Sequence, residues 1–396
     1  PPVLRVLRPF AAAATLAMSV ALGACAAVRR PPATEASLRA DAVGQRADQR
    51  ALVDTVVARL ARRAVARGDR TLDVLLLSGG GQHGAYGAGF LRGWRMRADA
   101  PMPRFDLVTG ISTGALQSPF ALLGTPASLD TLAALYRRAA DRIAPTIDWW
   151  FWLRRTGGVV NTARYRRTLE STLDDATRDS LRARFAEDRQ LLVATADFDL
   201  GVGRTWDLAR AMDTTAAGLA RTHAILLGAT AIPGIFPPVV LDGHVHADGG
   251  VIGNVLPVLD LDAYRALGAR LRAAGIAEPV TVRVWTILNL WTHAEPQVMN
   301  PASRRAMSSR STSLLFFAAQ PQLLQQLAAV GRAVSAEVPN VRVEVRYTAI
   351  PDSLSTAPGA RKLFDAGWMR RLEGIGEARA RSAAPWDSLV SAYARP

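Results

Sequence analysis

A serine between two glycines, in the stretch Gly110-Ile111-Ser112-Thr113-Gly114, is the candidate nucleophile of this chain. Residues 105–109 before it are apolar and partly β-branched, which predicts a buried strand, and residues 115–123 predict a helix. A strand, a G-x-S-x-G turn and a helix form the setting of a nucleophile elbow, in which the serine hydroxyl lies near a helix N-terminus. The same residues would also suit an ordinary glycine-rich connection, so the rest of the sequence must decide.

A second glycine-rich loop, Ser78-Gly-Gly-Gly-Gln-His-Gly84, lies between a predicted strand at 72–77 and a predicted helix at 85–96. The N–H groups of Gly79, Gly80 and Gly81 carry no side chains in their way and can converge on an oxyanion. The loop lacks the Gly-Lys-Ser/Thr ending of a phosphate-binding P-loop. The glycine spacing also fits a dinucleotide fingerprint, so the loop alone leaves nucleotide binding open.

A candidate base, Asp248, begins the stretch Asp248-Gly249-Gly250 at the end of an apolar segment. An aspartate can deprotonate a serine when a dry pocket raises its pKa. Three alternatives remain for this residue. It can be a plain turn residue, or belong to a Ser-His-Asp triad, or form a metal site with His244 and His246, which alternate with it along a strand.

These three pieces together resemble the patatin-like phospholipase family, over roughly residues 72–257. The match rests on the oxyanion loop, the elbow and the Asp-Gly-Gly motif in family order, and on the segment 229–238 that precedes the aspartate. The supporting glycines are Gly84, Gly110, Gly114, Gly249 and Gly250. The family's loop often has Arg or Lys where this chain has His83, which leaves the support of the loop open.

The resemblance implies a three-layer α/β/α fold with a mostly parallel central sheet. It also implies a Ser112–Asp248 dyad, an oxyanion hole at Gly79, Gly80 and Gly81, and no cofactor or metal. The expected reaction is hydrolysis of acyl esters of lipids, with phospholipids or lysophospholipids as substrates. Two other functions stay open: a lipid acyltransferase with the same dyad, and a non-catalytic lipid-binding or assembly protein.

Composition restricts the remaining function classes. The 396 residues carry a net charge of +14, and all but one of the 48 basic residues are arginines. The arginines are scattered, without a basic stripe interleaved with stacking aromatics, so we expect no nucleic-acid partner. A single cysteine, Cys25, excludes an intrachain disulfide framework.

The N-terminal segment predicts a lipoprotein signal peptide at residues 1–24. Arg5 and Arg8 precede an apolar run that ends in Leu-Gly-Ala-Cys25, which resembles the bacterial lipoprotein box. An ordinary signal peptide or an uncleaved anchor is the alternative. We expect lipidation at Cys25 and a location in the bacterial cell envelope, on a membrane surface.

Three regions follow from the remaining patterns. Residues 25–70 hold the lipidated cysteine, a tether and an amphipathic helix at 35–67, expected to lie on the domain or, less favoured, on the membrane. Residues 71–385 form the catalytic domain. Its further predicted helices span 129–142, 215–229, 314–334 and 363–383, and its further strands 190–196, 281–290 and 341–348. An aromatic cluster, Trp149, Trp150 and Trp152, is interpreted as core packing, with contact to lipid as the alternative.

Overall fold

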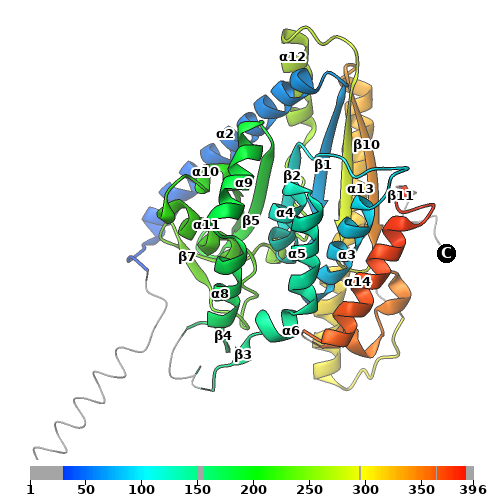
Figure 1. The fold of residues 1–396 in the computed structure, drawn as a ribbon. Coiled ribbons are helices and arrows are strands. Elements are labelled where there is room, and N and C mark those ends of the chain that lie inside the picture. Colours follow the sequence, from blue (N-terminus) through cyan, green and yellow to red (C-terminus); the bar gives the residue numbers. More distant parts are fainter. Residues whose placement is uncertain (1–29, 150, 152–155, 294–295, 363, 389–396) are drawn as a thin grey trace, which may run out of the picture.

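The computed structural model describes residues 30–149, 151, 156–293, 296–362 and 364–388. Its centre is a sheet of nine strands in the order β11-β10-β9-β1-β2-β5-β8-β7, with β6 also paired to β5 (Figure 1). The run β10-β9-β1-β2-β5 is parallel throughout, and antiparallel strands extend it at both sides. The predicted α/β fold with a mostly parallel sheet is therefore confirmed.

The strands in the middle of the sheet are buried. Their bounds are β1 Thr71–Leu77, β2 Leu107–Ile111, β3 Thr146–Ile147, β4 Val160–Asn161, β5 Gln190–Asp197, β6 Val202–Asp207, β7 Val239–Leu241, β8 His244–Asp248, β9 Val280–Leu288, β10 Val341–Ala349 and β11 Asp387–Ser388. Strands β3 and β4 pair only with each other, outside the main sheet.

The helices and single turns connect these strands. Their bounds are α2 Glu35–Arg67, η1 Gly81–His83, α3 Gly84–Arg95, α4 Thr113–Leu123, α5 Pro126–Arg137, α6 Ala139–Arg142, α8 Ala163–Thr172, α9 Asp175–Ala186, α10 Leu208–Ala211, α11 Ala216–Ala229, η2 Gly249–Val251, α12 Leu261–Ala273, α13 Arg304–Glu337, η3 Asp352–Leu354, η4 Pro358–Arg361 and α14 Ala366–Arg381.

Two apolar cores, one on each face of the sheet, make the fold three-layered. Along β1, Leu75 and Leu77 belong to one core, whereas Val74 and Leu76 belong to the other, because successive side chains of a strand point to opposite faces. Helices α3, α4, α5 and α14 cover the first core, and α2, α12 and α13 cover the second (Figure 1).

Helix α2 lies on the domain, as the favoured expectation had it. The side chains of Val56, Val57 and Leu60 are buried against the sheet and α12. Arg67 ends the helix and donates to the carboxylates of Asp73 and Asp106, which are both fully buried at the start of their strands. This ion-pair network fixes the C-terminal end of the helix at the N-terminal ends of β1 and β2, opposite the candidate site.

Several predicted elements differ from the observed ones in extent. The single helix expected at 129–142 is two helices, α5 and α6, and the helix expected at 314–334 begins earlier, at Arg304. Helices α8, α9 and α12 were not predicted. Among the described residues, no helix is long and apolar enough to cross a membrane. The predicted signal peptide and Cys25 lie outside the described residues.

Candidate active site

Ser112 occupies a sharp turn between β2 and α4. Its backbone has φ 51° and ψ −121°, in the left-handed region that a residue with a side chain rarely adopts. The two flanking glycines leave no room for side chains: a Cβ on Gly110 would lie 2.3 Å from the Gly114 carbonyl oxygen, and one on Gly114 would lie 2.3 Å from that of Leu77. The strand, turn and helix of the predicted elbow are therefore present.

Strand β5 brings Asp248 to this serine. On one edge of β5, Ile111 of β2 pairs with Ala194, and Asp248 of β8 pairs with the next residue, Thr195. The Ser112 hydroxyl donates a hydrogen bond to Oδ2 of Asp248 at 2.5 Å. The Gly250 N–H donates to Oδ1 at 2.8 Å, so both carboxylate oxygens are held.

The Asp248 carboxyl is almost completely buried, with 5% of its surface exposed. Burial raises the pKa of Asp248 to about 6, although the hydrogen bonds from Ser112 and Gly250 oppose that shift. Such a carboxyl can both accept a proton and return it near neutral pH, which is what a general base needs.

The glycine loop packs directly against the elbow. A Cβ on Gly79 would lie 3.1 Å from the Cβ of Ser112. The Gly79 N–H already donates to the Asn254 carbonyl oxygen at 3.0 Å. Among the described residues, the backbone N–H groups of Gly80 and Gly81 have no hydrogen-bond acceptor. The N–H group of Thr113 lies in the first turn of α4, where a helix provides no acceptor for it. These three groups are the available oxyanion donors.

A buried polar network holds the glycine loop. The Asn289 amide nitrogen Nδ2 donates to the Ser78 carbonyl at 2.9 Å and to the Gln117 side-chain oxygen at 3.1 Å. The Ser78 hydroxyl accepts from the Asn289 backbone N–H at 2.7 Å. Sequence reasoning missed Asn289 and Gln117, because isolated amide residues in apolar segments carry no local signal of their partners.

His83 supports the same loop as a neutral side chain. Its Nδ1–H donates to the Gly80 carbonyl at 2.9 Å, and its ring lies edge-on to Trp291 with centroids 4.8 Å apart. Burial lowers the pKa of His83 to about 4, against the opposing effect of the carbonyl bonds. The loop is thus supported by a hydrogen bond where the family's pattern often has a fixed positive charge.

Asn254 is a further residue that sequence reasoning missed. It follows the Asp248-Gly249-Gly250 motif by a few residues, and its backbone carbonyl accepts the Gly79 N–H. Its side chain is 8% exposed, and its amide nitrogen has no hydrogen-bond partner among the described residues. Asn254 therefore joins the oxyanion loop to the segment that carries Asp248.

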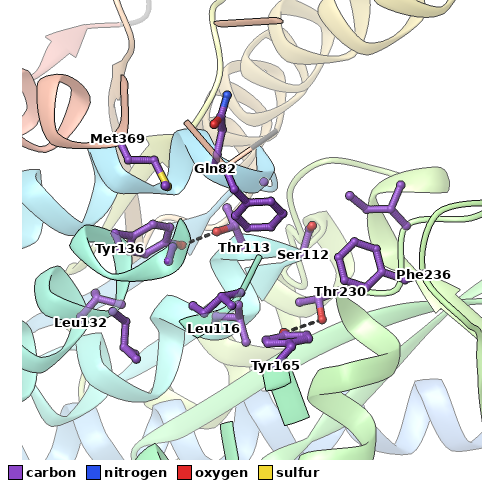
Figure 2. A pocket seen from close by; sticks show the side chains of 16 residues that line it. Gln82, Ser112, Thr113, Leu116, Leu132, Tyr136, Tyr165, Thr230, Phe236 and Met369 are labelled. Carbon is purple, nitrogen blue, oxygen red and sulfur yellow. Dashed lines mark hydrogen bonds between the residues drawn. The ribbon is translucent and has the colours of Figure 1, made fainter. Parts of the chain in front are cut away.

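An apolar pocket of about 640 Å³, part of it open to solvent, begins at Ser112. Figure 2 shows Leu116, Leu132 and Tyr136 on one side of the serine, Phe236 on the other, and Tyr165 below the serine. The pocket's hydroxyl groups bond to each other: Thr113 pairs with Tyr136, and Tyr165 pairs with Thr230 at 2.7 Å. The walls thus present mainly apolar surface, which suits a hydrocarbon chain.

The histidine alternatives for the base find no support in the geometry. His246 Nδ1 bonds to the Thr195 hydroxyl at 2.9 Å, and His244 Nδ1 bonds to Asp197 at 2.8 Å. Within the described part of the chain, no histidine hydrogen-bonds to Ser112 or Asp248. Within the same residues, no group of three or more His, Cys, Asp or Glu side chains is arranged to hold a metal ion.

The aromatic cluster is only partly described. Trp149 is 80% exposed, so the core interpretation is wrong for this residue. Trp150 and Trp152 lie outside the described residues. The strand before Trp149, β3, pairs only with β4 and lies outside the main sheet, so Trp149 is not part of the sheet that carries the two cores.

Of the comparisons with known proteins, a family model covers the part of the chain that holds the candidate site. No curated protein shows a significant sequence match to the chain. Among solved structures, the chain is similar to VipD from Legionella pneumophila, with 13% identity and a TM-score of 0.33, over 78% of this chain and 66% of that one. A family model, patatin-like phospholipase, matches residues 75–262, which contain the glycine loop, Ser112 and Asp248. This match assigns residues 75–262, a little under half of the chain, to the patatin-like phospholipase family.

Proposed function

We propose that the protein hydrolyses acyl esters of membrane lipids with Ser112 as nucleophile and Asp248 as general base. One observation carries the proposal: the Ser112 hydroxyl donates to a buried carboxylate at 2.5 Å, at the start of an apolar pocket. Membership of the family supports acyl lipids as the substrate class. Phospholipids and lysophospholipids are the substrates we propose.

In the acylation step, the Asp248 carboxylate takes the proton of Ser112 while Oγ attacks the ester carbonyl carbon. The carbonyl oxygen becomes negatively charged and accepts hydrogen bonds from the N–H groups of Gly80, Gly81 and Thr113. When the tetrahedral intermediate collapses, the ester C–O bond breaks and the leaving alcohol takes the proton from Asp248. The acyl group remains on Ser112 as an ester.

Deacylation repeats the sequence with water. Asp248 accepts a proton from the water molecule as its oxygen attacks the acyl carbon, and the same N–H groups hold the second oxyanion. The intermediate then releases the Ser112 oxygen, which takes the proton back from Asp248. The fatty acid leaves, and the serine and the carboxylate are restored. No metal or redox cofactor takes part in this scheme.

We also propose that Cys25 carries a lipid anchor that holds the enzyme on an envelope membrane. The support is the sequence pattern alone, in which the sole cysteine ends an apolar, small-residue segment. An anchor would keep the pocket beside its lipid substrate and raise the local substrate concentration.

The test is hydrolysis of a panel of phospholipids, lysophospholipids and neutral esters by the wild type and by Ser112→Ala. A fluorophosphonate probe should label the wild type and not Ser112→Ala. Ser118→Ala is the matched control, because Ser118 is buried on the same helix and its hydroxyl bonds to the Ala115 carbonyl instead. Labelling without lipid turnover would point to a different acyl substrate, and unlabelled wild type would refute the nucleophile.

A product analysis separates hydrolysis from acyl transfer. With a lipid alcohol added as acceptor, a hydrolase continues to yield mainly free fatty acid, whereas a transferase yields the new ester. A protein that binds lipid vesicles and yields neither product would favour the non-catalytic alternative.

A further inference from the structure

Three apolar side chains are exposed within five residues of one another, next to the pocket. Ile147 is 59% exposed, Trp149 80% and Phe151 42%. They belong to the segment that runs from α6 through β3 towards β4, at the end of the molecule opposite α12 (Figure 1). Large apolar side chains grouped on a surface indicate a binding face, because leaving them in water is unfavourable.

This segment is attached to the wall of the acyl pocket at both of its ends. Before it, Ile143 lines the pocket. After it, the N–H groups of Val159 and Val160 both donate to the Ile235 carbonyl, at 2.9 and 3.2 Å. Phe236, the next residue, lines the pocket as well. The three exposed side chains are therefore held beside the wall of the pocket that begins at Ser112.

Exposed arginines precede and follow the apolar residues in the chain. Arg138 precedes α6, and Arg164, Arg166 and Arg167 lie at the start of α8; all four are exposed. Among the described residues, none of the four is paired with a carboxylate, and Arg164 donates a hydrogen bond to the Asp141 backbone carbonyl at 3.2 Å. Arg164 and Arg167 line a shallow depression together with Asp141. Over residues 138–172 the sequence has seven arginines and three carboxylates, so the charge of this stretch is clearly positive.

The two features together fit a single kind of partner. Tryptophan and other apolar side chains enter the boundary between headgroups and acyl chains, and exposed arginines without a carboxylate partner attract anionic headgroups. A nucleic acid would use the arginines but leave Ile147 and Phe151 in water. A protein partner would not require the arginines to be unpaired.

We propose that this face, formed by Ile147, Trp149 and Phe151 with Arg138, Arg164, Arg166 and Arg167, docks the protein on an anionic phospholipid bilayer. In that orientation the wall formed by Ile143 and Phe236 faces the lipid, so an acyl chain can pass from the bilayer into the pocket without crossing water. A lipid anchor near the N-terminus would tether the protein but would not set which face meets the membrane, whereas this surface does.

The experiment labels single positions of the full chain with an environment-sensitive fluorophore. Cys25→Ser removes the sole cysteine, and Ser112→Ala prevents hydrolysis of the vesicles, so the result does not depend on the proposed catalytic role of Ser112. Ile147→Cys carries the label on the proposed face. Met96→Cys is the matched control, because Met96 is 52% exposed at the end of α3, away from the pocket.

Vesicles of phosphatidylcholine with phosphatidylglycerol should shift the emission of the label at position 147 to shorter wavelength and leave that at position 96 unchanged. Vesicles of phosphatidylcholine alone should give a smaller shift at position 147. An unchanged label at position 147, or equal shifts at both positions, would overturn the proposal. Equal shifts with both vesicle types would overturn the part of the proposal that assigns attraction for anionic headgroups to the arginines.

A charge reversal tests the arginines separately. Arg167→Glu should raise the lipid concentration needed for half of the emission change about fivefold or more, because each arginine near an anionic surface contributes attraction of that order. Arg270→Glu makes the same change in net charge on an exposed position at the end of α12 and should have less than a twofold effect. Equal effects of the two substitutions would show that only overall charge matters, which contradicts a defined docking face.

Discussion

Ile111 and Asp248 lie next to each other along one edge of β5, paired with the consecutive residues Ala194 and Thr195. Strand β6 pairs with residues 192–197 of β5, so it takes the other edge. Strands β2 and β8 therefore approach each other end to end from opposite directions. Because Ser112 directly follows Ile111, the register of the sheet places the serine beside the aspartate before any side-chain interaction forms.

The first prediction concerns Asp248→Asn, which should lose activity and gain stability at neutral pH. The buried carboxyl has a pKa of about 6, above the value of 3.8 expected in the unfolded chain. Between these values the folded state binds more protons, so the wild type loses stability as the pH rises through this range. Thermal or urea unfolding should show an advantage for the variant at pH 8, on the order of 3 kcal/mol, that disappears below pH 4. A variant less stable than the wild type at pH 8 would contradict this account.

The second prediction is the acid limb of the pH–rate profile. Asp248 must be ionised to take the serine proton, so kcat/KM should fall about tenfold per pH unit below pH 6. The measurement uses a soluble neutral ester, whose own charge does not change with pH. A limb centred near pH 7 would instead indicate a histidine base.

The third prediction concerns His83, whose pKa is lowered to about 4 in the folded protein from an ordinary value of 6.5. The unfolded chain binds the extra proton first, so stability from this residue is complete above pH 6.5 and is lost as the pH falls towards 4. His83→Gln keeps a donor for the Gly80 carbonyl and removes the titration. The difference in unfolding free energy between wild type and variant should therefore grow with pH between 4 and 6.5, and a constant difference would exclude the buried neutral imidazole.

The fourth prediction compares two adjacent glycines of the oxyanion loop. A Cβ on Gly80 would lie 2.2 Å from the Asn289 backbone oxygen, whereas a Cβ on Gly81 would meet nothing within 4 Å. Both residues have positive φ, so each alanine variant carries some backbone strain. Gly80→Ala must also shift the loop, and we expect a loss of kcat of about 10²–10³, the usual effect of losing an oxyanion donor. Gly81→Ala should lose much less, and equal losses would mean that the backbone strain common to both variants, rather than the clash with Asn289, sets the effect.

Sequence reasoning reached the elbow, the glycine loop and Asp248 because each is a local pattern. A strand followed by glycines and a helix is readable from a dozen residues, as at Gly110–Gly114. Which N–H groups of the glycine loop are free to bind an oxyanion was less predictable. The Gly79 N–H is occupied by the backbone carbonyl of Asn254, and any residue type at that position could supply that carbonyl.

The pairing of the strands and the exposure of Trp149 both depend on long-range geometry, which a local sequence pattern does not show. The pairing of β5 with β2 and β8 joins residues about 50 to 80 positions apart in the chain, for which the sequence carries no local signal. The exposure of Trp149 follows from β3 and β4 lying outside the main sheet, whereas an aromatic cluster by itself indicates a core as readily as a surface.

The fifth prediction concerns the length of the acyl chain. Leu116 is a half-buried residue of α4 that lines the pocket four positions after Ser112. Leu116→Trp places a larger side chain in the channel, so esters with long chains should lose kcat/KM by about tenfold or more relative to esters with short chains. The rate of labelling by a small fluorophosphonate should stay close to that of the wild type, because that probe reaches Ser112 without filling the pocket. Equal losses on long and short esters, with normal labelling, would show that the acyl chain binds elsewhere, and the apolar pocket would then need another occupant.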